Sequence, residues 1–339
     1  MPDLFSHILD QQPAIDAILQ SADSGRLPHG VIFAGPPGVG KSTTARALAK
    51  WFLCDKGNDA PSMRLIDAGT HPDFHVITKE LVRLTSKTSK ATTLSIDVIR
   101  DHLVTPAMRK SVTGAGKVFI VEEADLMQAP AQNSLLKTLE EPAGRTLIVL
   151  LTPRPDDLLQ TIRSRAQVFR FGQLQDKTVF TQLKLKGFDP KTAEQATKIA
   201  NGSLGTAIKW IEDGVVEKSR ELIAHLDGLM ARRPGVNPLG DLGSWLKTAA
   251  DQYAEKQLER DENTSKDFAT RNGLSTYLLL AADYLRGTLS TETDPERLEH
   301  RCEAIDAIFR CEQYLDGNVN IALALAQFAG TMETALATR

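Results

Sequence analysis

The stretch Gly35-Pro-Pro-Gly-Val-Gly-Lys-Ser42 decides the fold. It matches the pattern GxxxxGK[ST], and it lies between an apolar run at residues 31–34 and a helical pattern over residues 43–53. In such a loop, backbone N–H groups point at phosphate oxygens, Lys41 reaches the β and γ phosphates, and Ser42 offers a hydroxyl to Mg²⁺. The stretch therefore predicts a loop that binds ATP or ADP with Mg²⁺, rather than an ordinary glycine turn. The candidate binding residues are Gly35, Pro36, Pro37, Gly38, Val39, Gly40, Lys41, Ser42 and Thr43.

Two acidic residues follow a second apolar run, in the sequence Val118-Phe-Ile-Val-Glu-Glu-Ala-Asp125. The carboxyl ends of parallel strands face the ligand crevice, so these acids are expected beside the phosphate loop. Glu122 is placed to hold Mg²⁺, and Glu123 is placed to orient an attacking water. A strand followed by two acidic residues is common in proteins, so these residues indicate a site only in combination with the phosphate loop.

A third apolar run ends in a hydroxyl, in the sequence Leu150-Leu-Thr152. Thr152 is a candidate hydrogen-bond partner for a γ-phosphate or a lytic water, although a threonine at this place is also an ordinary turn residue. Arg163 and Arg165 follow. Either they are solvated cations at a helix end, or one of them stabilises the charge of a transferring phosphoryl group.

The first half of the chain alternates short apolar runs with helical patterns, which is typical of an α/β domain with a parallel sheet and helices on both faces. The expected strands are residues 31–34, 74–78, 118–121, 147–151 and 168–171. After residue 171 the pattern is helical, with interruptions at 232–240 and 255–266. We predict an α/β domain over 1–172, a small helical domain over 173–213 and an all-helical domain over 214–339.

Composition limits the classes of function. The chain has 339 residues, and its 40 Lys+Arg against 43 Asp+Glu give a net charge of −3. Without an overall basic field, a stand-alone DNA-binding protein is not expected. The first residues are too polar for a signal peptide and no later run is apolar enough to span a membrane, so we expect a cytoplasmic protein with no membrane partner. The three cysteines form no CxxC pair.

Several longer stretches carry a specific resemblance. They are Gly25-Arg-Leu-Pro-His-Gly, the phosphate loop, Ala68-Gly-Thr-His-Pro-Asp-Phe74, Asn133-Ser-Leu-Leu-Lys-Thr-Leu-Glu-Glu-Pro142 and Thr161-Ile-Arg-Ser-Arg165. Together and in this order they resemble the clamp-loader branch of the AAA+ ATPases. The resemblance implies an α/β P-loop AAA+ domain, a small helical lid domain and an all-helical collar that forms oligomers.

The resemblance also implies roles and partners. Glu122 and Glu123 match the Walker B pair, Thr152 matches sensor 1, and Arg165 matches the arginine that reaches the nucleotide of a neighbouring motor subunit. The implied partners are motor (gamma/tau-type) and delta subunits of the clamp loader and, through the complex, the sliding clamp and primed DNA. The implied activity is ATP-driven loading of the clamp for a bacterial replicative DNA polymerase.

Three departures from the family pattern bear on the kind of subunit, two of them on catalysis and one on metal binding. Glu122 replaces their Asp, and Mg²⁺ tolerates little deviation from octahedral geometry. Gly205 stands where they place the sensor 2 arginine. Cys54 stands without the other three cysteines of the zinc module that many relatives carry, so we expect no zinc site. We therefore expect the chain's own ATPase activity to be weak or absent, with a catalytically active motor ATPase as the alternative.

A basic cluster leaves two interpretations open. Its members are Arg100, Arg109, Lys110 and Lys117. In relatives this region lies near the chamber that holds primed DNA, where such side chains would contact phosphates. The alternative is an ordinary exposed helix and loop.

Overall fold

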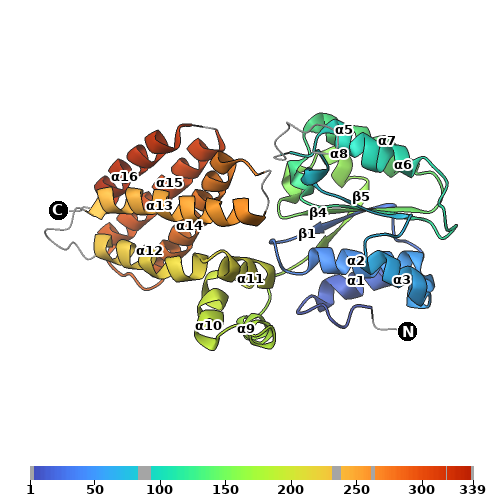
Figure 1. Cartoon of the computed structure of the whole chain (residues 1–339), viewed down its shortest axis with the longest axis horizontal. Helices are drawn as coiled ribbons and strands as arrows, with labels where there is room; N and C mark the ends of the chain where they lie inside the picture. The colour runs from blue at the N-terminus through green and yellow to red at the C-terminus, as the bar shows by residue number, and fades with distance from the viewer. Residues whose placement is uncertain (1–3, 83–92, 231–237, 261–263, 318, 337–339) are drawn as a thin grey trace. The chain divides into compact units, whose positions relative to one another are not determined.

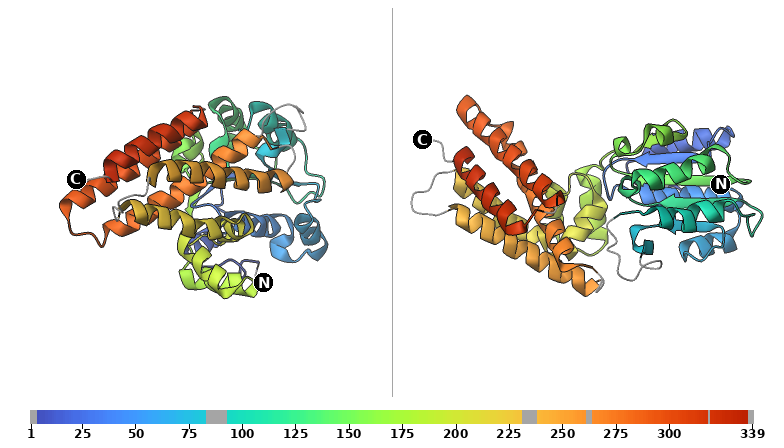
Figure 2. Two further views of the ribbon diagram at one scale, coloured as in Figure 1. Left: turned by 60° about the vertical axis from the view of Figure 1, so that its left-hand side comes forward. Right: turned by 90° about the horizontal axis from the view of Figure 1, so that it is seen from above.

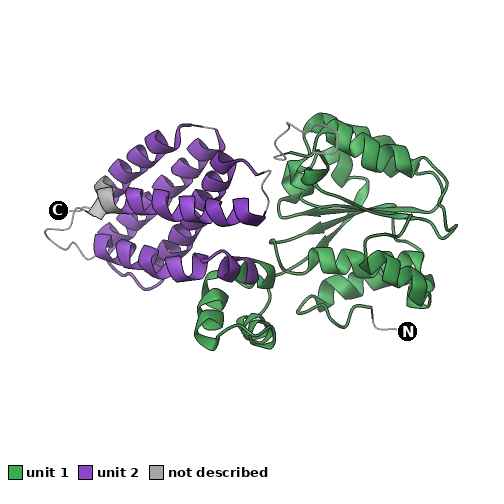
Figure 3. Ribbon diagram, viewed as in Figure 1, with its two compact units in different colours: residues 1–207 green, residues 208–339 purple. Residues whose placement is uncertain are grey.

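The structure, a computed structural model, describes residues 4–82, 93–230, 238–260, 264–317 and 319–336. The chain divides into two compact units, Met1–Ala207 and Ile208–Arg339 (Figure 3). Unit 1 carries the candidate phosphate loop, and unit 2 is built from helices alone in its described residues. The finer division into three domains, at residues 172 and 213, remains a prediction.

Unit 1 is organised around a five-stranded parallel sheet with the order β2-β3-β4-β1-β5. Its strands are β1 (Gly30–Ala34), β2 (Phe74–Ile77), β3 (Lys117–Val121), β4 (Thr146–Thr152) and β5 (Ala166–Arg170). Every residue of β1, β3 and β4 is buried, because a parallel sheet with helices on both faces has no solvent-facing side. The expected strands are confirmed to within two residues at each end.

Helices cover both faces of this sheet (Figure 1). One face carries α1 (Gln12–Asp23), α2 (Lys41–Leu53) and α3 (Ala60–Asp67), and the other carries α5 (Ile96–Ile99), α6 (Thr105–Ala107), α7 (Ala129–Glu140) and α8 (Gln160–Arg163). The π-helical turn η3 (Arg100–Val104) joins α5 to α6. Short 3₁₀ turns are η1 (Asp55–Gly57), η2 (Lys79–Leu81), η4 (Ala124–Leu126) and η5 (Pro155–Asp157). Leu135 of α7 and Leu103 of η3 pack with Ile148 of β4 in one apolar core, which fixes the strand ends that carry the site.

Three helices follow the sheet in the chain. They are α9 (Asp176–Leu185), α10 (Pro190–Ile199) and α11 (Leu204–Glu212). The helical pattern expected after residue 171 is confirmed in these three helices, and the start of α11 lies in unit 1 with the phosphate loop.

Unit 2 contains the helices α12 (Val215–Met230), α13 (Pro238–Arg260), α14 (Lys266–Leu289), α15 (Pro295–Asp316) and α16 (Ile321–Leu336). Helix α14 packs on α13 and α15, and α16 packs on α13 and α15, so the helices lie side by side in a bundle (Figure 2). The expected all-helical region is confirmed. The interruption expected from residue 255 is wrong at its start, because α13 continues to Arg260. Among the described residues, none of the helices has the length and apolar character needed to cross a membrane.

Candidate functional site

The glycine-rich loop joins β1 to α2. Gly38 has φ +70° and Gly40, which precedes α2, has φ +104°, and both values lie in the left-handed region that favours glycine. This backbone places the loop at the N-terminal end of α2, where free N–H groups and the helix dipole favour an anion. The predicted strand, loop and helix are all present in the expected order.

Lys41 is folded into the loop and is only 8% exposed. Its Nζ donates hydrogen bonds of 2.6 Å to the carbonyl oxygens of Gly35 and Pro36. Burial lowers the pKa of Lys41 to about 8, and the negative charge of Asp125 partly opposes this shift. A buried cation held only by neutral carbonyl groups gains from an incoming anion. The loop therefore has the charge and the backbone geometry of a phosphate site.

Ser42 and the first acidic residue lie together. The Ser42 hydroxyl donates a hydrogen bond of 2.9 Å to Oε1 of Glu122, which follows directly after β3. A hydroxyl and a carboxylate side by side are oxygen ligands of the kind that Mg²⁺ takes beside phosphates. The two predicted metal-binding residues are thus brought together by α2 and β3.

Glu123 faces a cation that the sequence analysis missed. Its backbone is left-handed at φ +50°, and its carboxylate forms an ion pair of 2.9 Å with Nζ of Lys79, at the end of β2. The Glu123 carboxylate is therefore engaged by Lys79 in this arrangement. Lys79 follows a predicted strand, so the sequence places it at the carboxyl edge of the sheet, but it does not predict the ion pair with Glu123.

Thr152 is fully buried, and its hydroxyl is already hydrogen-bonded. Oγ1 donates to Asp125 Oδ1 at 3.1 Å and accepts from the backbone N–H of Arg154 at 3.0 Å. The guanidinium of Arg154 also pairs with Asp125, at 3.1 Å. The one proton of the Thr152 hydroxyl is directed at Asp125 rather than at the loop. Asp125 was quoted in the acidic motif but was given no role there.

The start of α11 rests on the phosphate loop within unit 1. Ser203 Oγ donates to the carbonyl of Pro37 at 2.7 Å, and the N–H of Gly205 donates to the carbonyl of Gly38 at 3.0 Å. A Cβ on Gly205 would lie 2.7 Å from the Cα of Gly38. The sensor 2 position therefore lies in direct backbone contact with the loop.

Arg165 does not join these residues. It comes directly before β5, whose Ala166 pairs with Gly30 at the start of β1, whereas the phosphate loop follows the end of β1. The intervening strand is about 13 Å long. Arg165 therefore lies at the amino-terminal edge of the sheet, away from its own chain's loop.

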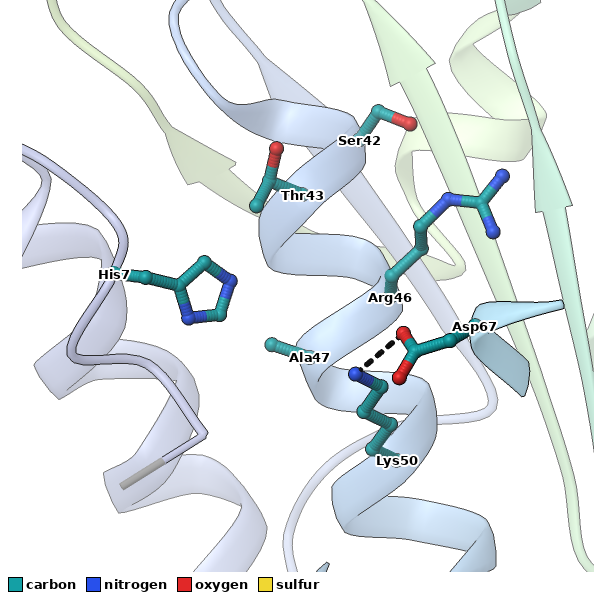
Figure 4. A pocket seen from close by; sticks show the side chains of 7 residues that line it. All are labelled: His7, Ser42, Thr43, Arg46, Ala47, Lys50 and Asp67. Atoms are coloured by element: carbon teal, nitrogen blue, oxygen red, sulfur yellow. Dashed lines mark ion pairs between the residues drawn. The ribbon is translucent and has the colours of Figure 1, made fainter. Parts of the chain in front are cut away.

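A pocket adjoins the loop along α2 (Figure 4). Its lining residues are His7, Ser42, Thr43, Arg46, Ala47, Lys50 and Asp67. Ser42 and Thr43 lie at the loop end of this pocket, while Lys50 and Asp67 form an ion pair of 2.6 Å at the other end. Arg46 lies over the ring of Phe74, 5.6 Å from its centroid. The pocket extends the site beyond the residues that the motif contains.

The basic cluster is divided by the structure. Arg100, Arg109 and Lys110 are exposed. Lys117 is buried, and its Nζ donates to the carbonyl oxygens of Pro106, Ala107 and Arg109. The interpretation of Lys117 as a phosphate contact is therefore wrong, because its charge caps the carboxyl end of a helical segment.

Metal ligands are not clustered elsewhere in the described part of the chain. No group of three or more His, Cys, Asp or Glu side chains there could hold a metal ion. Cys54 is buried and unpaired, and burial raises its pKa to about 11. The absence of a zinc site remains a prediction.

Comparison with known proteins finds related sequences. A sequence model described as "DNA polymerase III, delta subunit" matches residues 10–175. The DNA polymerase III subunit delta′ of Bacillus subtilis is 31% identical over 230 residues, which are 66% of this chain and 66% of that protein. The subunit tau of Salmonella typhimurium is 27% identical over 63% of this chain and 33% of that protein.

A solved structure, a DNA polymerase III gamma subunit-related protein of Thermotoga maritima, is 21% identical and covers 96% of this chain and all of that chain, with a TM-score of 0.42. The match to the delta′ relative spans just under two thirds of its length. Together with the parallel sheet and the phosphate loop, these similarities show that the chain is related to the delta′ subunits of DNA polymerase III.

Proposed function

We propose that the chain is a cytoplasmic clamp-loader subunit of a bacterial replicative DNA polymerase. It binds ATP or ADP at the loop of residues 35–43 and supplies Arg165 in trans to a neighbouring motor subunit. The position of Arg165 carries the second part of this proposal. An arginine at the opposite edge of the sheet from its own loop can act on a phosphate only in another subunit.

The residues present fit a nucleotide with Mg²⁺. Lys41 is a buried cation at the N-terminal end of α2, and Ser42 and Glu122 place a hydroxyl and a carboxylate 2.9 Å apart beside it. Lys41 and the loop N–H groups would hold the phosphates, and Ser42 and Glu122 would hold Mg²⁺. When bound, the ion neutralises charge on the phosphate oxygens.

Three contacts support weak hydrolysis by this chain. Lys79 neutralises Glu123. The Thr152 hydroxyl donates to Asp125. Gly205 provides no cation for a γ-phosphate, and its backbone contact with Gly38 leaves no room for a side chain. A motor site uses these three positions to sense or attack a γ-phosphate. Here the side chains of Glu123 and Thr152 are bonded to other residues, and Gly205 carries no charged side chain.

The alternative is an active motor ATPase. The hydrogen bond between Ser42 and Glu122 favours this alternative, and so does the carboxylate of Glu123, the next residue in the chain. The alternatives differ in which substitution matters. In a motor subunit, Lys41→Ala abolishes hydrolysis. In the proposed subunit, Arg165→Ala removes hydrolysis at the neighbouring site, while Lys41→Ala removes only nucleotide binding to this chain.

The deciding experiment assembles this chain with motor and delta subunits and measures the clamp-stimulated ATPase for wild type, Lys41→Ala and Arg165→Ala. We expect a large loss only with Arg165→Ala, and an isolated chain that hydrolyses ATP far below about 1 per second. Loss only with Lys41→Ala would establish the motor alternative. In the isolated chain, ADP should raise the melting temperature of wild type but not of Lys41→Ala, which tests nucleotide binding separately.

A further inference from the structure

The guanidinium of Arg165 is held by its own chain. Nε donates to Oε1 of Glu140 at 2.5 Å, and Nη2 pairs with the same oxygen. Nη1 donates to the carbonyl of Thr161 at 3.1 Å and, more loosely, to Ser164 Oγ at 3.3 Å. An arginine side chain has several rotatable bonds, so these contacts select one orientation out of many.

Glu140 contacts one edge of the Arg165 guanidinium. Nε and Nη2 form the side edge of the planar group, whereas Nη1 and Nη2 together form its end edge. Each of these edges can approach a carboxylate or a phosphate with two parallel N–H groups. Glu140 thus holds Arg165 by its side edge, Thr161 and Ser164 hold Nη1, and the side chain remains 36% exposed.

Glu140 itself stands on a rigid support. It is the last residue of α7, and the preceding Leu139 is buried against Gly30 at the start of β1. The backbone of Arg165 lies beside the same residue, since its carbonyl oxygen also faces Gly30. A carboxylate at the carboxyl end of a helix interacts unfavourably with the helix dipole, so helix stability does not explain a glutamate there.

We propose that Glu140 is a positioning residue that pre-orients Arg165 for the nucleotide of the neighbouring subunit. This inference rests on the proposed function of Arg165 in trans. Glu140 touches no reacting atom. It removes conformational entropy of the arginine side chain before the subunits meet.

The test uses complexes assembled with motor and delta subunits and compares wild type, Glu140→Gln, Arg165→Ala and the double variant. The quantity measured is the part of the clamp-stimulated ATPase rate that Arg165→Ala removes. We expect Glu140→Gln to lower the kcat of that part about tenfold, with the KM for ATP within about twofold. The double variant should equal Arg165→Ala alone, because Glu140 acts only through Arg165.

The matched control is Asp156→Asn. Asp156 forms an ion pair of 2.5 Å with Arg163, two residues before Arg165, and should leave the rate unchanged. If Arg165→Ala lowers the rate but Glu140→Gln behaves like Asp156→Asn, the role of Glu140 is wrong and the proposed function stands. A faster rate in Glu140→Gln would mean that Glu140 sequesters the arginine, which also overturns the inference. An unchanged rate in Arg165→Ala would overturn the proposed function itself.

Discussion

At the scale of single residues, the site depends on a close approach of two glycines. Gly205 donates its N–H to the carbonyl of Gly38, and the two backbones leave no room for a methyl group between them. The contact ties the start of α11 to the phosphate loop through main-chain atoms. A substitution that adds only a methyl group at Gly205 is therefore enough to test how much this contact stabilises the protein.

Gly205→Ala should destabilise the protein, because the new Cβ would lie 2.7 Å from the Cα of Gly38 and must displace either the loop or the start of α11. Overpacking of this kind costs about 1–3 kcal/mol, measurable as a fall in the free energy of unfolding in urea. The control is Gly172→Ala, since a Cβ on Gly172 meets no atom within 4 Å. Equal stability of the two variants would show that the contact is loose in solution.

Single residues also mark the limit of what the sequence predicts. Lys41, Ser42 and Glu122 were predicted as a site, because a motif and a strand end determine where each of them lies. Lys79 and Asp125 were not, because their roles depend on which side chains meet across separate strands. The spacing of residues in the sequence does not predict which side chains meet in this way.

At the scale of elements, a buried lysine ends a helical segment. Nζ of Lys117, the first residue of β3, donates to three carbonyl oxygens at the carboxyl end of α6 and the residues after it. Carbonyl groups at a helix end have no partner within the helix, and a cation there also complements the helix dipole. Burial lowers the pKa of Lys117 below its usual value, which is the cost of this arrangement.

Lys117→Met should therefore destabilise unit 1 by about 1–3 kcal/mol, because several buried carbonyl oxygens lose their donor. Lys110→Met changes an exposed side chain nearby and should stay within about 0.5 kcal/mol of wild type. Urea denaturation of both variants measures the difference. If the stabilities coincide, the Lys117 ammonium is solvated and the DNA interpretation of this residue returns.

Strands were easier to predict than helix ends. Strands β1, β3 and β4 are fully buried, so their apolar runs are continuous, and the bounds of all five strands were predicted to within two residues. The charged stretch from residue 255 was expected to interrupt a helix, yet α13 continues to Arg260. Arg260 donates to the buried carboxylate of Asp213, 47 residues earlier in the chain, and a local pattern cannot contain that contact.

At the scale of the whole molecule, the contacts between α11 and the phosphate loop come from residues before 208. Ser203, Gly205 and the start of α11 all belong to unit 1, and the division between the units falls within α11. The first 172 residues therefore lack part of the site, although they contain the entire sheet. The phosphate loop, the sheet and the small helices of unit 1 should behave as one folding unit.

A chain of residues 1–213 should accordingly unfold in one cooperative transition and bind ADP with an affinity close to that of the full chain. A chain of residues 1–172 should be less stable by at least about 2 kcal/mol, because the carbonyl oxygens of Pro37 and Gly38 lose their donors and apolar surface is exposed. Urea unfolding and the ADP-dependent rise in melting temperature measure both effects. The matched comparison is Lys41→Ala in the 1–213 chain, which should fold but not respond to ADP.

If 1–172 equals 1–213 in stability and in its response to ADP, the contacts from α11 do not support the loop. If 1–213 fails to fold cooperatively, the helices of unit 2 stabilise unit 1, and the division at residue 207 does not separate independent units.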